Sequence, residues 1–201
     1  MKETTAKKKF MWNMAGSLCN SLSSMLLLII VNRISGESRG GFFALAYSTA
    51  QLLFSVGGFE IRPVQSTDIK NKFTFNQYFT SRMLNCIIML ICMIGYIVVN
   101  GYTGVEALTV FWILGYRMVE AVADVYSGLF QQRERIDISG KEMLMRSGIS
   151  TITFTIILWL TDNLLYAAMT LTLTSLVIML FYDLHMKKYF EPTPVHLEWR
   201  G

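Results

Sequence analysis

The sequence predicts an all-α integral membrane protein built as a bundle of six transmembrane helices. Of its 201 residues, 53% are hydrophobic and only 16% are charged, whereas a soluble domain has about 25% charged residues. The charges are grouped in short blocks, separated by apolar runs close to bilayer length. These runs use up most of the chain, which excludes a soluble domain of ordinary size, roughly 100 residues or more.

The expected spans follow a basic segment, 1–10, which resembles the start of a signal peptide. The first apolar run is too long for a signal core and no small-residue cleavage site follows it, so we expect an uncleaved span. The fifth span is short and threonine-rich, which is tolerated where helices pack together. The expected spans are 11–34, 40–59, 83–99, 105–130, 148–161 and 164–184, forming a six-helix lobe over 11–185 that precedes a tail or linker, 186–201.

The distribution of lysine and arginine predicts the topology. Of the 18 basic residues, fifteen lie before the first span or after the second, fourth and sixth spans. Arg33 and Arg39 lie near the first outer loop, and Arg117 lies inside the fourth span. Basic loops stay in the cytoplasm, so we expect an even number of spans with both termini cytoplasmic, in the inner (plasma) membrane.

Several other functions are not indicated by the residues. The three cysteines lie inside apolar runs and form no CxxC pair, and the two histidines are far from them, so we expect no metal site. P-loop, GxSxG, HExxH and dinucleotide motifs do not occur. The basic residues sit beside spans, where membrane insertion explains them. We therefore expect no enzyme, no cofactor and no nucleic-acid partner.

The fourth span carries charges on one helical face. Arg117, Glu120 and Asp124 follow i, i+3, i+7 spacing, and Gln131 continues the face. Three charges deep in a bilayer raise the free energy of insertion by roughly 7 to 10 kcal/mol, and about a dozen apolar residues lower it by only about 4 to 7 kcal/mol. This face should therefore meet other helices or a water-filled cavity.

Two interpretations of this face remain open. In the first, Arg117 and Glu120 form a structural ion pair. In the second, which the usual role of intramembrane charges favours, the face is a substrate or proton site. Glu120 and Asp124 are like charges four residues apart, which repel on a helix, so one of the two could hold a proton at neutral pH.

Four more polar residues are candidates for the cavity or its gate. They are Asn13 in the first span, Arg33 at its outer end, and Glu60 with Arg62 at the inner end of the second span. Each has a simpler interpretation. Asn13 could bond a neighbouring helix, Arg33 could be an interfacial anchor, and Glu60 with Arg62 could form an interfacial ion pair.

Certain residue patterns resemble a transporter family. The first two spans contain N-x-x-G at Asn13, V-N-R-I-S-G at Val31 and G-G-F-F-A-L-A at Gly40. The fourth span and its exit read R-x-x-E-x-x-x-D-x-x-x-G-x-x-Q-x-x-x-R-x-D from Arg117 to Asp137. Together these resemble, over about residues 10 to 190, the amino-terminal half of Wzx-type (O-antigen or polysaccharide) oligosaccharide flippases of the multidrug/oligosaccharidyl-lipid/polysaccharide exporter superfamily.

The resemblance implies a lobe of a two-lobe transporter. Such proteins move undecaprenyl-diphosphate-linked oligosaccharides across the bacterial inner membrane during synthesis of lipopolysaccharide and other surface polysaccharides. It implies that Arg117 faces the cavity and that Glu120 and Asp124 tune it. The expected partners are the lipid-linked oligosaccharide, membrane lipid and a second lobe, either a copy or a separate chain. The alternatives are a cation-coupled drug exporter with Asp124 as proton carrier, or a non-transporting partner or gene remnant.

Overall fold

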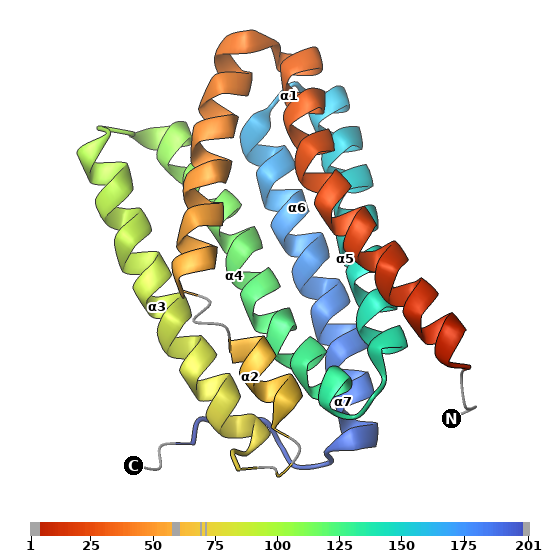
Figure 1. Cartoon of the computed structure of the whole chain (residues 1–201). Coiled ribbons are helices and arrows are strands. Elements are labelled where there is room, and N and C mark those ends of the chain that lie inside the picture. Colours follow the sequence, from red (N-terminus) through yellow and green to blue (C-terminus); the bar gives the residue numbers. More distant parts are fainter. Residues whose placement is uncertain (1–4, 58–60, 69, 71, 199–201) are drawn as a thin grey trace.

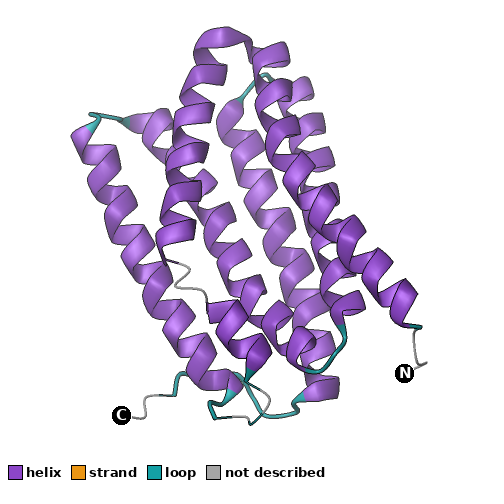
Figure 2. Cartoon of the chain, in the orientation of Figure 1, coloured by secondary structure: helices purple, strands orange, loops and turns teal. Residues whose placement is uncertain are grey.

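The computed structural model describes residues 5–57, 61–68, 70 and 72–198, and in these residues helices joined by turns and loops are present and no strand is (Figures 1 and 2). The predicted all-α membrane bundle is confirmed. Its elements are α1 (Ala6–Gly57), α2 (Ile61–Thr67), α3 (Phe75–Val99), α4 (Gly104–Gln132), α5 (Ile136–Thr161), α6 (Leu164–Ile178), the π-helical turn η1 (Met179–Asp183) and α7 (Leu184–Phe190).

Helix α1 folds back on itself and supplies two of the six long passes. A straight helix of its 52 residues would be about 78 Å long, more than twice the roughly 30 Å of a hydrocarbon core. It bends at Gly36, where φ is 83° and ψ is 171°, a conformation essentially confined to glycine. The arms rise from the N-terminus and return side by side (Figure 1). The loop expected at 35–39 is therefore a kink within one helix.

The other passes are α3, α4, α5 and the continuous path from α6 through η1 to α7. Four described segments are long and apolar enough to cross a membrane: Ala6–Ser55, Phe75–Val99, Ile136–Thr161 and Leu164–Phe190. The first contains both arms of α1. Helix α4 is not among them, which fits the charges on its face.

Three passes extend well beyond the spans expected from hydropathy. Helix α3 starts at Phe75 and not near 83, and α5 starts at Ile136 and not near 148. The last pass ends at Phe190, beyond 184. Asp137, Glu142 and Arg146, on the early part of α5, are buried in the bundle, so the polar segment is a helical extension and not a loop.

Helix α4 is the centre of the bundle and contacts every other described helical element. In the outer half it buries Val110, Ile113 and Leu114 against residues such as Phe154 and Leu171. The surface of the bundle carries exposed apolar side chains instead, including Val99, Trp159 and Phe181. A buried charged face and an apolar exterior are the arrangement expected of a membrane bundle.

A close helix crossing joins α1 to α5 near the end that holds the termini. A Cβ atom built on Gly16 would lie 2.2 Å from the carbonyl oxygen of Gly140, and one on Gly140 would lie 2.3 Å from that of Trp12. Small residues allow helix backbones to approach this closely in membranes. The crossing fixes the inner part of α5 against α1.

The segment after α7 crosses beneath the bundle to α3, at the end where the N-terminus also lies (Figure 1). Asn76 Nδ2 lies 3.0 Å from His196 Nδ1, and the Glu198 N–H donates to Thr80 Oγ1 at 2.8 Å. Lys187 Nζ donates to the Thr193 carbonyl oxygen. The tail is thus docked on the ends of the helices.

Candidate functional site

A cavity of about 160 Å³ lies among α1, α2, α4 and α5, at the level of the charged half of α4. Charged side chains of both signs converge on it from three helices. Its lining residues are Asn20, Phe54, Arg62, Glu120, Asp124, Ser127, Met143 and Arg146. We call it the charged cavity.

Asp124 bridges two arginines that come from different helices. Arg62 Nη1 of α2 donates to Asp124 Oδ1 at 3.0 Å, and Arg82 Nη2 of α3 donates to Oδ2 at 2.9 Å. The Arg82 side chain is 2% exposed and that of Asp124 is 19% exposed. One carboxylate facing two guanidinium groups leaves a net positive charge at this side of the cavity.

Arg62 is held in place by further contacts. Its Nε donates to Gln131 Oε1 at 3.2 Å, and its Nη2 donates to Ser139 Oγ at 3.5 Å. The structure therefore brings Gln131, Arg62 and Asp124 together. Glu60, expected as the partner of Arg62, lies outside the described residues, and Arg62 pairs with Asp124.

Helix α2 is positioned on α4 by a glycine and a loop. A Cβ atom on Gly128 would lie 2.3 Å from Gln65 Oε1, so the glycine admits α2. Gln132 Nε2 donates to the Asp68 carbonyl oxygen at 2.6 Å. The N–H groups of Lys72 and Phe73 donate to the Asp68 carboxylate and lower its pKa. These contacts fix the helix that carries Arg62.

Arg117 and Glu120 form the expected i, i+3 ion pair, and both are buried. Glu120 lines the cavity and accepts from Asn20 Nδ2 at 3.0 Å. The Arg117 guanidinium lies 4.4 Å from the ring centre of Tyr47 and 5.5 Å from that of Tyr116. Arg117 is thus turned toward these two rings and does not line the charged cavity. That Arg117 faces the transport cavity of a two-lobe protein, as the resemblance implies, stays a prediction.

Arg146 supplies the second cationic side chain of the cavity wall. Its Nε donates to Glu142 Oε1 at 2.5 Å, and both residues are buried on α5. Neither residue was a candidate from the sequence, because both lie between the spans expected at 105–130 and 148–161. Their i, i+4 spacing would have indicated a pair if α5 had been extended to Ile136. Arg82 was missed because it resembles an ordinary interfacial cation before a span.

Two other candidates lie away from the cavity. Asn13 lies at the α1–α5 crossing, where its Cα would be 2.5 Å from a Cβ built on Gly140. Its buried Oδ1 has no hydrogen-bond partner among the described residues. Arg33 is exposed near the outer turn of α1. Nor do the described residues contain a group of three or more His, Cys, Asp or Glu side chains that could hold a metal ion.

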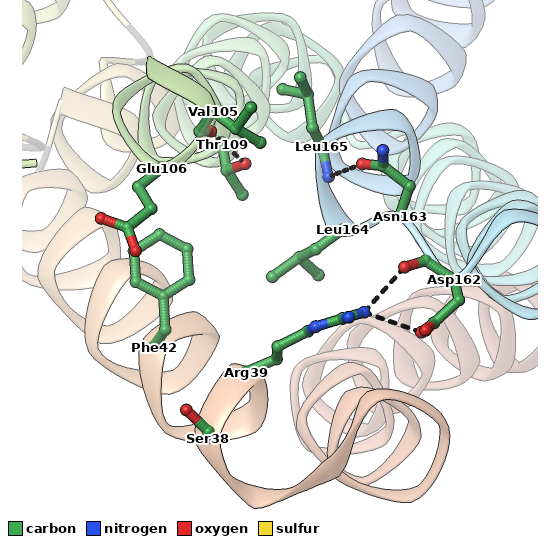
Figure 3. A pocket seen from close by; sticks show the side chains of 10 residues that line it. All are labelled: Ser38, Arg39, Phe42, Val105, Glu106, Thr109, Asp162, Asn163, Leu164 and Leu165. Carbon is green, nitrogen blue, oxygen red and sulfur yellow. Dashed lines mark hydrogen bonds and ion pairs between the residues drawn. The ribbon is translucent and has the colours of Figure 1, made fainter. Parts of the chain in front are cut away.

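A second pocket, of about 340 Å³, lies at the opposite end of the bundle (Figure 3). Here Arg39 is turned toward Asp162, with Nη1 2.9 Å from Oδ1 and 2.8 Å from the Asp162 carbonyl oxygen. Both side chains are at least half exposed, at 50% and 59%. This ion pair ties the α1 bend to the α5–α6 turn, and we call its surroundings the outer pocket.

A comparison with protein families finds a match. The family model described as polysaccharide biosynthesis protein matches residues 6–198, a range that contains the charged cavity and every described helix. No curated protein and no solved structure matches the chain.

Proposed function

This chain belongs to the polysaccharide biosynthesis protein family, and on that premise we propose that it is a transporter, and not an enzyme, for lipid-linked oligosaccharides. The proposed cargo is an undecaprenyl-diphosphate-linked oligosaccharide, moved from the cytoplasmic to the outer leaflet of the inner membrane. The observation that carries this proposal is the charged cavity, where Arg62 and Arg146 line a partly buried space between helices of the bundle.

The charge balance of the cavity and its ion-pair partners suits an anion. Among the described residues, four arginines stand against three carboxylates, which is one positive charge in excess. The arginines are Arg62, Arg82, Arg117 and Arg146, and the carboxylates are Glu120, Asp124 and Glu142. Guanidinium groups bind phosphate oxygens with two parallel hydrogen bonds, and burial strengthens such contacts because the local dielectric constant is low.

The size of the cavity indicates which part of the cargo it binds. At about 160 Å³ it is smaller than the roughly 300 to 1,000 Å³ of drug-sized sites. We therefore assign it to the diphosphate, with the sugars and the lipid tail outside it. The proposed place for the sugars is the space between this lobe, residues 11–185, and a second lobe joined through the tail, 186–201.

The proposed orientation supports entry of the diphosphate from the cytoplasm. Both termini lie at the same end of the bundle as α2, the helix that carries Arg62 (Figure 1), and the basic blocks predict that this end is cytoplasmic. The diphosphate of a lipid-linked oligosaccharide in the cytoplasmic leaflet would then lie close to Arg62.

Binding of a diphosphate by the purified chain tests this proposal. The probe is a symmetrical dialkyl diphosphate, titrated against the chain in lipid nanodiscs. Arg62→Gln should weaken binding about 10-fold to 100-fold, since a hydrogen bond to a charged group is worth about 1.5 to 3 kcal/mol. The matched control, Arg39→Gln in the outer pocket, should leave the affinity unchanged. Equal binding by the Arg62→Gln variant, or preferential binding of a cationic drug, would contradict the assignment.

A further inference from the structure

We propose that Asp183 is a reversible proton site behind the charged cavity, and that its proton controls how strongly the cavity attracts an anion. The effect on anions rests on the proposed function, whereas the proton site stands on its own geometry. Asp183 is 0% exposed. Both of its carboxyl oxygens are buried and have no hydrogen-bond donor within the part of the chain that the structure describes.

A π-helical turn directs Asp183 inward. It is the last residue of η1, which interrupts the regular helix between α6 and α7 and contacts α4 and α5. On the same turn Phe181 is 78% exposed toward the surface. Turns of this kind occur mostly as single interruptions of α-helices, frequently at functional sites. The local backbone thus separates a lipid-facing aromatic residue from a buried acid.

The groups that face Asp183 come from two neighbouring helices and from its own turn. Helix α5 contributes Glu142 and Arg146, helix α4 contributes Tyr126, and Tyr182 precedes Asp183 in η1. Among the described residues, the cation whose charge acts on Asp183 is Arg146, which already pairs with Glu142. An ionised Asp183 would be a second buried carboxylate beside Glu142 with no hydrogen bond of its own. Burial and the neighbouring carboxylate both disfavour the charged form of such a group, which is the environment of a proton-binding acid.

Arg146 connects the proton site to the cavity. It lines the cavity, it pairs with Glu142, and its Nη1 is buried without an acceptor among the described residues. When Asp183 gives its proton to water, it gains a negative charge that competes for Arg146 and cancels the excess positive charge. Anion binding and proton binding therefore favour each other, as reciprocal linkage requires.

Infrared spectroscopy of the full chain in nanodiscs tests the proton site directly. The wild type should show the carbonyl-stretching band of a buried protonated carboxylic acid at neutral pH. Asp183→Asn should remove this band, and Glu37→Gln, at an exposed acid, should leave it unchanged. Glu142→Gln should weaken it, because the variant removes the negative charge beside Asp183 and the carboxylate that pairs with Arg146. A band that persists in Asp183→Asn, or that is unaffected by Glu142→Gln, would overturn the assignment.

The link to the cavity is tested with the dialkyl diphosphate, whose charge does not change over the pH range used. The wild-type affinity should fall at least threefold as the pH is raised through the range in which the infrared band disappears. In Asp183→Asn the affinity should not depend on pH in that range. The same pH dependence in both proteins would overturn the link. If the wild type binds no probe at any pH, the proposed function fails, and the infrared result still decides whether Asp183 holds the proton.

Discussion

The two ends of the bundle use the same pair of residue types in opposite environments. In the outer pocket Arg39 and Asp162 form an ion pair that is about half exposed, whereas in the charged cavity Arg82 and Asp124 form a pair with distances as short and far less solvent. An exposed pair gains about 0 to 1 kcal/mol because water competes with it. A buried pair cannot lose one partner without leaving a charge in a medium that solvates it poorly. The two pairs have similar contact distances, so their different burial decides how much each one contributes to stability.

The largest expected effect is at the buried pair. Asp124→Asn removes a carboxylate that pairs with Arg82, which is 2% exposed, and removing one partner of a buried pair costs about 3 to 5 kcal/mol. Thermal unfolding in detergent, followed by circular dichroism, should show the loss. The double variant Asp124→Asn/Arg82→Gln should recover part of it. A change below about 1 kcal/mol would place Asp124 with the exposed pairs and break the comparison.

The next effect concerns the backbone contact at the inner end. Gly140→Ala places a methyl group 2.3 Å from the Trp12 carbonyl oxygen, so α1 and α5 must separate, at a cost of about 1 to 3 kcal/mol. Gly148→Ala is the matched control on the same helix, because its new methyl group would meet only Cys19 Sγ at 3.7 Å. Unfolding temperatures of the two variants compare the sites. Equal stability would show that the crossing is not tight.

The outer turn provides a similar test of backbone strain. Gly36→Ala puts a side chain on a residue with φ of 83°, which costs about 1 to 3 kcal/mol. The new methyl group would meet nothing within 4 Å, so the effect is conformational and not steric. Gly41→Ala, also in open space, should be neutral or slightly stabilising, since alanine is the better helix former. A neutral Gly36→Ala would mean that the hairpin does not need this bend.

The smallest effect is expected at the outer ion pair. Arg39→Gln should change the free energy of unfolding by about 0 to 1 kcal/mol, and added salt should reduce even that. Unfolding of the wild type and the variant at low and at high ionic strength measures both the change in the free energy of unfolding and its dependence on salt. A loss as large as that of Asp124→Asn would show that exposure does not decide the strength of these pairs.

Much of the architecture was predictable because bilayer insertion leaves a clear record in the sequence. Apolar runs marked the passes, and the turns at Asn100–Gly104 and Asp162–Asn163 lie where short polar segments predicted them. The charges of Arg117, Glu120 and Asp124 indicated that α4 has a buried face. Hydropathy identifies the part of a helix that lies in the membrane core and does not show where the helix begins. The polar first turns of α3 and α5 were therefore expected to be loops.

The candidate site was only partly predictable for the same reason. Glu120 and Asp124 were found because a charge within an apolar run is conspicuous. Arg82, Glu142 and Arg146 were missed because they lie in polar stretches, where charges are common. That Asp124 pairs with Arg62 and Arg82 depends on the packing of three helices, which no spacing along one helix encodes. Asp183 was not singled out from the sequence, because its burial follows from the π-helical turn that contains it.

The central claim is that the charged cavity, and not the outer pocket, receives the diphosphate of a lipid-linked oligosaccharide. A genetically encoded diazirine analogue of methionine in place of Met143, which lines the cavity, tests this in native membranes. A diazirine analogue of leucine in place of Leu164, in the outer pocket, is the control. After illumination, mass spectrometry should find the lipid-linked oligosaccharide attached at position 143 and not at 164. Attachment of ordinary phospholipid alone at 143, or of the oligosaccharide only at 164, would contradict the account.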